Sequence, residues 1–220
     1  MKKYELVIFD VDGTLLDTTE GVLASVQYTI DVHTLPRLSS EDLQMFIGPP
    51  IQNSFKKFYS FDDERNQTLA ETFRNRYKEH DLLKAVPYNN IYEVLDFLRN
   101  ENIKIAVATY KRQDYAVEIL KHFNFDKYTD ILYGADNFNK LKKKDIIKKC
   151  IEDSAVEKYE NVLMIGDSDN DAIGAEEIGV DFLGVTYGFG FKKKKDIQAY
   201  QAVGSADDPL EIIKFFKGEK

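Results

Sequence analysis

Two carboxylates separated by one residue follow a short apolar run near the start of the chain. Residues 6–9 are apolar and rich in β-formers, which predicts a buried strand, and Asp10 and Asp12 come directly after it. In open α/β sheets, ligands bind beyond the carboxyl ends of the strands, so both side chains are expected to project into a crevice. Acidic groups this close repel each other unless a cation lies between them or one holds a proton. Carboxylate oxygens at this spacing suit Mg²⁺. The stretch therefore indicates a site that binds this ion.

Two other interpretations of this stretch are a tight polar turn and a calcium-binding loop. An EF-hand loop that starts at Asp10 needs Gly at its sixth position and Glu at its twelfth, where the chain has Leu15 and Gly21. The spacing therefore excludes the calcium loop. The polar turn stays open on these residues alone.

Polar side chains also follow two later apolar runs. Thr109 follows residues 103–108, and Asp167 and Asp171 follow residues 162–165; between them, lysines at 140 and 142–144 precede a helical pattern. Carboxylates that hold Mg²⁺, a hydroxyl and an ammonium that bind an anion, and a further carboxylate beside the metal together indicate phosphoryl transfer. In that chemistry, positioning and charge neutralisation supply most of the catalysis.

The Asp-rich segment 167–171 has its own alternatives. Its alternating aspartates could belong to a calcium loop, but Ala172 stands where Gly is needed and Ile178 where Glu is needed. A helix N-cap at Ser168 or Asp169 stays open.

The order of the elements predicts an α/β fold. After Pro87, strand-like runs alternate with amphipathic helical segments, which indicates parallel strands joined by right-handed crossovers. With residues 6–9 they predict a Rossmann-like parallel sheet core with helices on both faces. We expect strands at 103–108, 131–133, 162–165 and 181–185, and helices at 91–99, 112–123, 142–151, 172–178 and 209–216.

Residues 18–86 carry helical periodicity without a strand pattern. We expect one helix that starts near Thr18, a second capped by Ser39, a break at Ile47-Gly48-Pro49-Pro50, and a long helix over 64–83. The domain boundaries are therefore expected at 1–17 and 87–220 for the catalytic core and at 18–86 for an inserted all-helical cap domain. An insert at this place can cover the crevice as a lid.

Composition narrows the class of protein. The 220 residues contain 30 Lys and Arg against 38 Asp and Glu, so the formal charge is −8, which argues against general binding of nucleic acid or anionic membrane. The N-terminus has no signal-peptide pattern and no apolar run could span a bilayer, so we expect a cytoplasmic protein. The lone Cys150 cannot form an internal disulfide. The scattered histidines argue against a His-based zinc site; they are His33, His80 and His122.

Together, the motifs resemble the four motifs of the haloacid dehalogenase (HAD) superfamily of phosphohydrolases. The matching segments are Asp10-Val11-Asp12-Gly13-Thr14, the strand that ends in Thr109, a lysine ahead of a helix, and Gly166-Asp167-Ser168-Asp169-Asn170-Asp171. The resemblance covers essentially the whole chain. The insert 18–86 resembles the helical C1-type cap of the phosphoglycolate phosphatase and β-phosphoglucomutase group, and Ile47-Gly48-Pro49-Pro50 is similar to a loop common in such caps.

The resemblance implies an aspartyl-phosphate mechanism. Asp10 would attack phosphorus, and Asp12 would protonate the leaving alkoxide and then activate the hydrolytic water. Mg²⁺ would be bound by Asp10, by Asp167 and by the backbone carbonyl of Asp12, with Asp171 ordering metal-bound water. The phosphoryl group would be bound by Thr109, Tyr110 and the family's lysine.

Two assignments within this set are less direct. The family's lysine is best matched by Lys143, because residues 143–147 fit a frequent Lys-x-Asp/Glu-Val-Ile pattern, while Lys142 and Lys144 stay alternatives. Tyr110 stands where Ser or Asn is common in the family, which leaves the substrate contacts near it undefined. A late lysine run at 192–195, after Gly188-Phe189-Gly190-Phe191, is interpreted as solvated charge rather than a substrate-steering patch.

The branches of the superfamily differ at single residues. Dehalogenases and phosphonate hydrolases usually lack an acid at the place of Asp12, and mutases that resemble β-phosphoglucomutase carry a His at the place of Val22. We therefore predict a Mg²⁺-dependent phosphatase acting on a small phosphorylated metabolite, with phosphoglycolate as first substrate and a 5′-nucleotidase or sugar-phosphate phosphatase as alternatives. A phosphomutase and a catalytically idle binding protein rank lower. We expect no nucleic-acid or membrane partner, and a monomer or homodimer.

Overall fold

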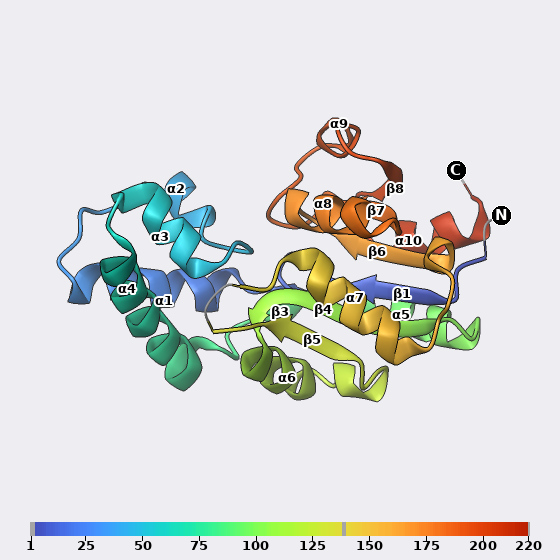
Figure 1. Ribbon diagram of the computed structural model, residues 1–220, viewed down its shortest axis with the longest axis horizontal. Helices are drawn as coiled ribbons and strands as arrows, with labels where there is room; N and C mark the ends of the chain where they lie inside the picture. The colour runs from blue at the N-terminus through green and yellow to red at the C-terminus, as the bar shows by residue number, and fades with distance from the viewer. Residues whose placement is uncertain (1–2, 138–139, 220) are drawn as a thin grey trace. The chain divides into compact units, whose positions relative to one another are not determined.

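The computed structural model describes residues 3–137 and 140–219. The chain divides into two compact units. Unit 1 comprises residues 1–17 and 87–220, and unit 2 comprises residues 18–86, drawn from blue to teal in Figure 1. Each unit has its own core and is described by itself.

Unit 1 is built on a six-stranded sheet whose described pairings are all parallel. The central strand β1 pairs with β4 on one side and with β6 on the other, and none of its four residues is exposed to solvent. Burial on both faces explains why β1 is a continuous apolar run rather than an alternating pattern. In spatial order the strands are β5 (Leu132–Ala135), β4 (Lys104–Arg112), β1 (Leu6–Phe9), β6 (Val162–Gly166), β7 (Asp181–Val185) and β8 (Ala202–Ala206).

Helices cover both faces of this sheet. One face carries α7 (Lys143–Ser154) and α8 (Asp169–Ile178), which lie on the side toward the viewer in Figure 1 and pack on alternate strand residues such as Leu6 and Ile8. The other face carries α5 (Ile91–Asn100), α6 (Gln113–His122) and α10 (Pro209–Lys217). The predicted fold class is confirmed. Short helical segments complete the unit: η2 (Phe125–Lys127), η3 (Tyr159–Asn161) and α9 (Lys194–Ile197).

Several elements differ from the expectation. The strand expected over 103–108 continues to Arg112, because residues past Ala108 rejoin β5 after a shift in register. Strand β8 was not predicted, since its sequence Ala-Val-Gly-Ser-Ala lacks the apolar run of a buried strand and lies at the sheet edge. Two-residue strands, β2 (Leu16–Asp17) and β3 (Val86–Pro87), were also missed; they lie where the chain passes between the units.

Unit 2 contains α1 (Thr19–Val32), α2 (Ser40–Gln44), α3 (Ile51–Tyr59) and α4 (Asp63–Arg76). Ser39 caps α2 as predicted, accepting a hydrogen bond from the backbone N–H of Asp42 at 3.1 Å. The long helix expected over 64–83 is wrong in one respect: after α4 the chain continues as a π-helix, η1 (Tyr77–Asp81). Aromatic side chains form much of the core, with Phe46 packed edge-on against Phe55.

Unit 2 buries one carboxylate among three partners, which we call the Asp81 cluster. Asp81 is fully buried and accepts hydrogen bonds from the Ser25 hydroxyl at 2.9 Å and from Arg76 Nε at 2.8 Å, while Lys84 Nζ lies 2.8 Å from its other oxygen. Burial acts to raise the pKa of Asp81, but Lys84, Arg76 and Ser25 outweigh it, so the pKa lies below its ordinary value. The charge of Asp81 is thus matched within the fold.

Candidate active site

The loop after β1 carries Asp10 and Asp12 at the carboxyl edge of the sheet. Asp10 continues the ladder, donating its backbone N–H to the carbonyl of Ile165 at 3.0 Å, and the chain then turns back so that Gly13 N–H donates to the Leu16 carbonyl at 2.9 Å. The two aspartates are each only 6% exposed. Two carboxyl groups are therefore held inside the protein at the end of a fully buried strand.

Lys143, the first residue of α7, contacts two of the predicted carboxylates at once. Its Nζ lies 2.7 Å from Asp10 Oδ1 and 2.6 Å from Asp171 Oδ1, and its side chain is 3% exposed. The Tyr110 hydroxyl accepts the backbone N–H of Lys143 at 2.9 Å, which fixes the start of α7. Tyr110 thereby supports the lysine, whereas its predicted contact with phosphate stays a prediction.

The neighbouring lysines point elsewhere. Lys142 is exposed, and Lys144, whose side chain is 38% exposed, lies 3.3 Å from Glu177 on α8. Of the three alternatives only Lys143 contacts the carboxylates of the edge in the described part of the chain. The geometry therefore favours Lys143 for any role at that edge.

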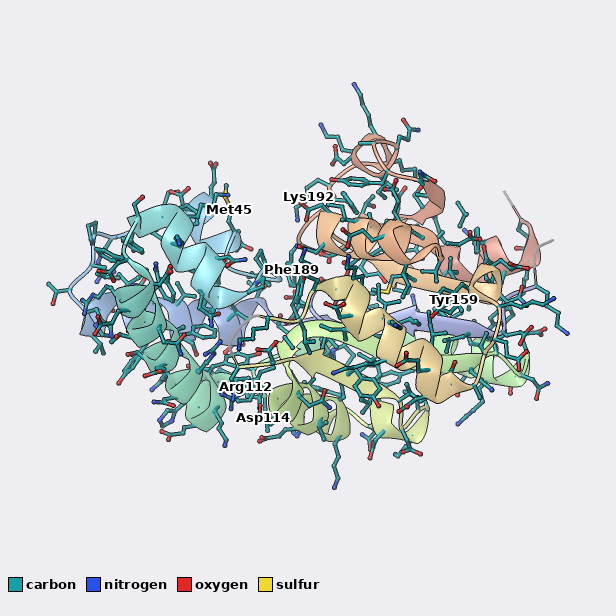
Figure 2. All side chains as sticks on the ribbon, viewed as in Figure 1. Met45, Arg112, Asp114, Tyr159, Phe189 and Lys192 are labelled. Carbon is teal, nitrogen blue, oxygen red and sulfur yellow. The ribbon has the colours of Figure 1, made fainter. Side chains whose placement is uncertain are left out.

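Asp167, at the end of β6, is oriented by a loop that follows β7. Its Oδ2 accepts the backbone N–H groups of Phe189 at 2.5 Å and Gly190 at 2.9 Å. Lys192 closes the same loop by donating to the carbonyl of Gly188 at 2.8 Å; Phe189 and Lys192 are labelled on it in Figure 2. Lys192 thus has a structural partner, in contrast to the interpretation of the whole lysine run as solvated charge.

Close approach to Asp167 requires glycine at two positions. A Cβ at Gly13, where φ is +84°, would lie 2.2 Å from Asp167 Oδ2, and one at Gly188 would lie 2.5 Å from the same atom. Both glycines let backbone reach the carboxylate from opposite segments of the chain. Their presence is explained by the site rather than by the turns alone.

The buried charged groups at this edge form one set, which we call the edge cluster. Asp10, Asp167 and Asp171 each place a carboxylate oxygen within 4.8 Å of the others, and all three are buried. Asp12 adds a fourth carboxylate, and the cations are Lys143 and Lys111. With all four carboxyl groups ionised, two negative charges are in excess over the two ammonium groups.

The excess is reflected in the pKa values. Burial raises the pKa of Asp10 to about 8; Lys143 opposes this, while the nearby charges of Asp171, Asp167 and Asp12 add to it. Burial and the charge of Asp171 likewise raise the pKa of Asp167 to about 7, against the effect of the two backbone N–H groups and of Lys143. A cation among these oxygens would relieve the repulsion.

Lys111 pairs with Asp12 and was not predicted as a partner of it. Its Nζ lies 3.0 Å from Asp12 Oδ1, and both side chains are less than a tenth exposed. Lys111 follows Thr109 by two residues on β4, within the stretch where the register with β5 shifts. Thr109 is buried, and its hydroxyl accepts the backbone N–H of Lys111 at 3.1 Å.

The site residues missed from sequence are thus Lys111 as the partner of Asp12 and the loop amides of Phe189 and Gly190. For Lys111, the signal was its place two residues after Thr109, just beyond the apolar run. For the loop, it was the pair Gly188 and Gly190 after the strand at 181–185. Neither signal names its carboxylate partner, because each contact joins distant segments of the chain.

Comparisons with known proteins identify the family of the chain. A family model described as haloacid dehalogenase-like hydrolase matches residues 7–185. The chain belongs to this family. The predicted resemblance is confirmed, and with it the prediction of a hydrolase of the phosphatase class.

Named relatives of this haloacid dehalogenase-like hydrolase cover most of its length. A 5′-nucleotidase of Pseudomonas aeruginosa is 32% identical over 200 residues, 90% of this chain and 89% of that protein. A pyrophosphatase PpaX of Halalkalibacterium halodurans is 30% identical over 208 residues, 94% of this chain and 95% of that one. The crystal structure of a predicted phosphatase from Clostridium acetobutylicum is 31% identical, with a TM-score of 0.87 over 96% of this chain and 99% of that chain.

Within the described residues, no helix has both the length and the apolar character that crossing a membrane demands.

Proposed function

We propose that the protein is a Mg²⁺-dependent phosphatase that hydrolyses a small phosphate ester through a phosphoryl group carried on Asp10. The observation that supports this most is the edge cluster itself. A buried ammonium lies 2.7 Å from the carboxylate in the nucleophile's position, among carboxylates in excess of cations. Such a site can receive both a divalent cation and a phosphate group.

The donor set suits Mg²⁺. Three buried carboxylate oxygens lie within 4.8 Å of one another, and hard oxygen ligands with an excess of negative charge are what this ion prefers. We assign the metal to Asp10, Asp167 and the backbone carbonyl of Asp12, with Asp171 ordering water on it. Mg²⁺ would neutralise charge on the phosphoryl oxygens.

The reaction then follows from the protein's own groups. An oxygen of Asp10 forms a bond to phosphorus while the bond from phosphorus to the leaving oxygen breaks, and that oxygen takes a proton from Asp12. In the second half, Asp12 accepts a proton from water as the water oxygen attacks phosphorus, and the bond to Asp10 breaks to release phosphate. Lys143 and Thr109 hold the phosphoryl group in place.

Nucleoside 5′-monophosphates are the first substrates to test. A relative at 32% identity is named a 5′-nucleotidase, and this alternative was already weighed beside phosphoglycolate and sugar phosphates. A second candidate is inorganic pyrophosphate, because a relative at 30% identity is named a pyrophosphatase. Phosphoglycolate stays in the comparison on the resemblance of the cap.

The test is phosphate release with and without Mg²⁺ from a panel of nucleoside monophosphates, pyrophosphate, phosphoglycolate and sugar phosphates. We expect Mg²⁺-dependent release with one preferred class. Asp10→Asn should lower kcat by roughly 10⁴-fold or more on every active substrate, because it removes the nucleophile.

A matched control is Asp153→Asn, since Asp153 lies near the far end of α7 and pairs with the Tyr133 hydroxyl. It should leave release unchanged. Hydrolysis by folded Asp10→Asn at the wild-type rate would contradict the proposal, as would the absence of release from the whole panel by the wild-type protein.

A further inference from the structure

Lys111 and Asp12 form a buried ion pair that the proposed mechanism does not use. The pair joins the loop after β1 to the extended end of β4, with Nζ and Oδ1 separated by 3.0 Å. The side chains are 6% and 8% exposed, so the ammonium is held in this position by the fold rather than by chance on the surface. The mechanism requires Asp12, not Asp10, to transfer protons.

The edge cluster divides its two cations between two tasks. Lys143 contacts Asp10 and Asp171, whereas the described contact of Lys111 is with Asp12. Asp12 lies in a tight buried loop, next to Gly13 at a positive φ, and its carboxyl group can take more than one rotamer on that backbone. A fixed ammonium on one carboxylate oxygen sets the direction in which the carboxyl group points.

Lys111 is itself fixed from two sides. Its backbone N–H donates to the Thr109 hydroxyl at 3.1 Å, and strand β4 continues through it to Arg112. Arg112 in turn pairs with Asp114 at the start of α6, and these two residues are labelled side by side in Figure 2. The extension of β4 past Thr109 thus places Lys111 within contact distance of the Asp12 carboxylate.

We propose that Lys111 is a positioning residue that aims the carboxyl group of Asp12 at the leaving-group oxygen. This inference rests on the proposed function and deepens it, because it assigns control of proton transfer to a residue that has no role in the mechanism proposed above. Lys111 is given no bond-making role. It affects catalysis only through the orientation of the Asp12 carboxyl group.

The consequence is a dependence on the leaving group. An alkyl phosphate, such as a nucleoside 5′-monophosphate, needs a proton on its departing alkoxide, whereas p-nitrophenyl phosphate releases a stable phenolate without one. Losing a well-placed general acid costs roughly 10²- to 10⁴-fold where the proton is needed. A displaced Asp12 should therefore slow the two ester classes unequally.

The experiment measures kcat/KM of Lys111→Met on the preferred alkyl phosphate and on p-nitrophenyl phosphate, since kcat/KM reports on the step that transfers the phosphoryl group to the enzyme. We expect a loss of about 10²-fold on the alkyl ester and a loss roughly tenfold smaller on the aryl ester. Lys111→Arg, which keeps a cation, should recover part of the alkyl activity. Lys148→Met, the same change at an exposed residue of α7, should affect neither ester.

A double-variant cycle separates positioning from direct contact. If Lys111 acts through Asp12, Lys111→Met should cost little further on the alkyl ester once Asp12 is already Asn. Equal losses on both esters, or a full further loss in the double variant, would mean that Lys111 grips the phosphoryl group and would overturn the proposal. Unchanged activity would overturn it too.

The measurements distinguish failure of the proposed function from failure of the role given to Lys111. Thermal unfolding of each variant shows whether it is folded, and Lys111→Gln, polar and of similar length, replaces Lys111→Met if that variant does not fold. The wild-type protein is assayed first: if it releases no phosphate from any ester with Mg²⁺, the proposed function has failed. If it is active but the leaving-group pattern is absent, only the role of Lys111 has failed.

Discussion

The two units each bury charged side chains, and they do so in opposite ways. In unit 2, one carboxylate, Asp81, is matched by Arg76, Lys84 and a hydroxyl, and its pKa is lowered. In unit 1, four carboxylates share two lysines, and the pKa values of Asp10 and Asp167 are raised. Removing one partner from a matched buried charge destabilises a fold, whereas a cluster of carboxyl groups with raised pKa values is a candidate ligand site.

The comparison also shows how each cluster is built. The Asp81 cluster comes from residues 25–84, within one unit of consecutive helices. The edge cluster collects side chains from the ends of β1, β4 and β6 and from the starts of α7 and α8, which follow strands of one parallel sheet. The first cluster therefore forms within one helical unit, and the second depends on the topology of the sheet.

The largest effect should follow from removing the central cation of the edge cluster. Lys143→Met leaves Asp10 and Asp171 buried without it, so we expect the free energy of unfolding of unit 1 to fall by about 3–5 kcal/mol. Because the chain has no Trp, hydrogen exchange followed by mass spectrometry of peptides from β1 and β6 is the suitable measurement. Lys144→Met serves as the control and should change unfolding by less than about 0.5 kcal/mol. Equal protection in the two variants would contradict the account.

A somewhat smaller fall in the free energy of unfolding is expected when the Asp81 cluster of unit 2 is disrupted. Asp81→Asn removes the carboxylate that Arg76 and Lys84 share, and since both cations retain access to water we expect a loss of about 2–3 kcal/mol, measured by exchange of peptides from α1 and α4. Asp63→Asn is the matched control, because Asp63 forms an exposed pair with Lys56 in the same unit and should give no resolvable change. A loss in Asp63→Asn as large as in Asp81→Asn would break the distinction between matched buried charge and surface charge.

The smallest effect concerns pH. The pKa of Asp167 is raised to about 7 by folding, so between its unfolded and folded pKa values the folded state binds a proton that the unfolded state does not. In chelator-treated protein, Asp167 should therefore raise the stability of unit 1 by about 1 kcal/mol as the pH falls from about 8 to about 6, and Asp10, whose pKa is raised to about 8, should add to this rise. Asp167→Asn should reduce this dependence.

For Asp81 we expect the stability of unit 2 to change with pH in the opposite direction. Its pKa is lowered by folding, so the stability it contributes is present above its ordinary pKa and is lost as the pH falls through the lowered value. Unit 2 should therefore lose protection only in acid. A parallel response of the two units to pH would show that their charges are not organised differently.

The sequence predicted the parts of the site that follow from chemistry at strand ends. Asp10, Asp12, Asp167 and Thr109 each follow an apolar run, and the parallel sheet brings those ends together. The choice of Lys143 over its neighbours rested on a motif, and burial now separates the three lysines. The roles given to these residues stay predictions until they are measured.

The remainder was not readable because it depends on contacts across the fold. The pairing of Lys111 with Asp12 needs the extension of β4, which the sequence pattern ended at residue 108. The hydrogen bonds from the backbone N–H groups of Phe189 and Gly190 to Asp167 depend on the path of the loop after β7. Strand β8 lacks an apolar run because an edge strand is half exposed, so periodicity gave no sign of it.

The most direct test of the central claim is to trap the phosphoryl group on the protein. Asp12→Asn, incubated with Mg²⁺ and p-nitrophenyl phosphate, can still lose the aryl leaving group but lacks the base that activates water. We expect a burst of about one p-nitrophenolate per protein, and peptide mass spectrometry should place one phosphoryl group on Asp10. A phosphoryl group on another residue, or rapid steady turnover by Asp12→Asn with none on the protein, would contradict the account.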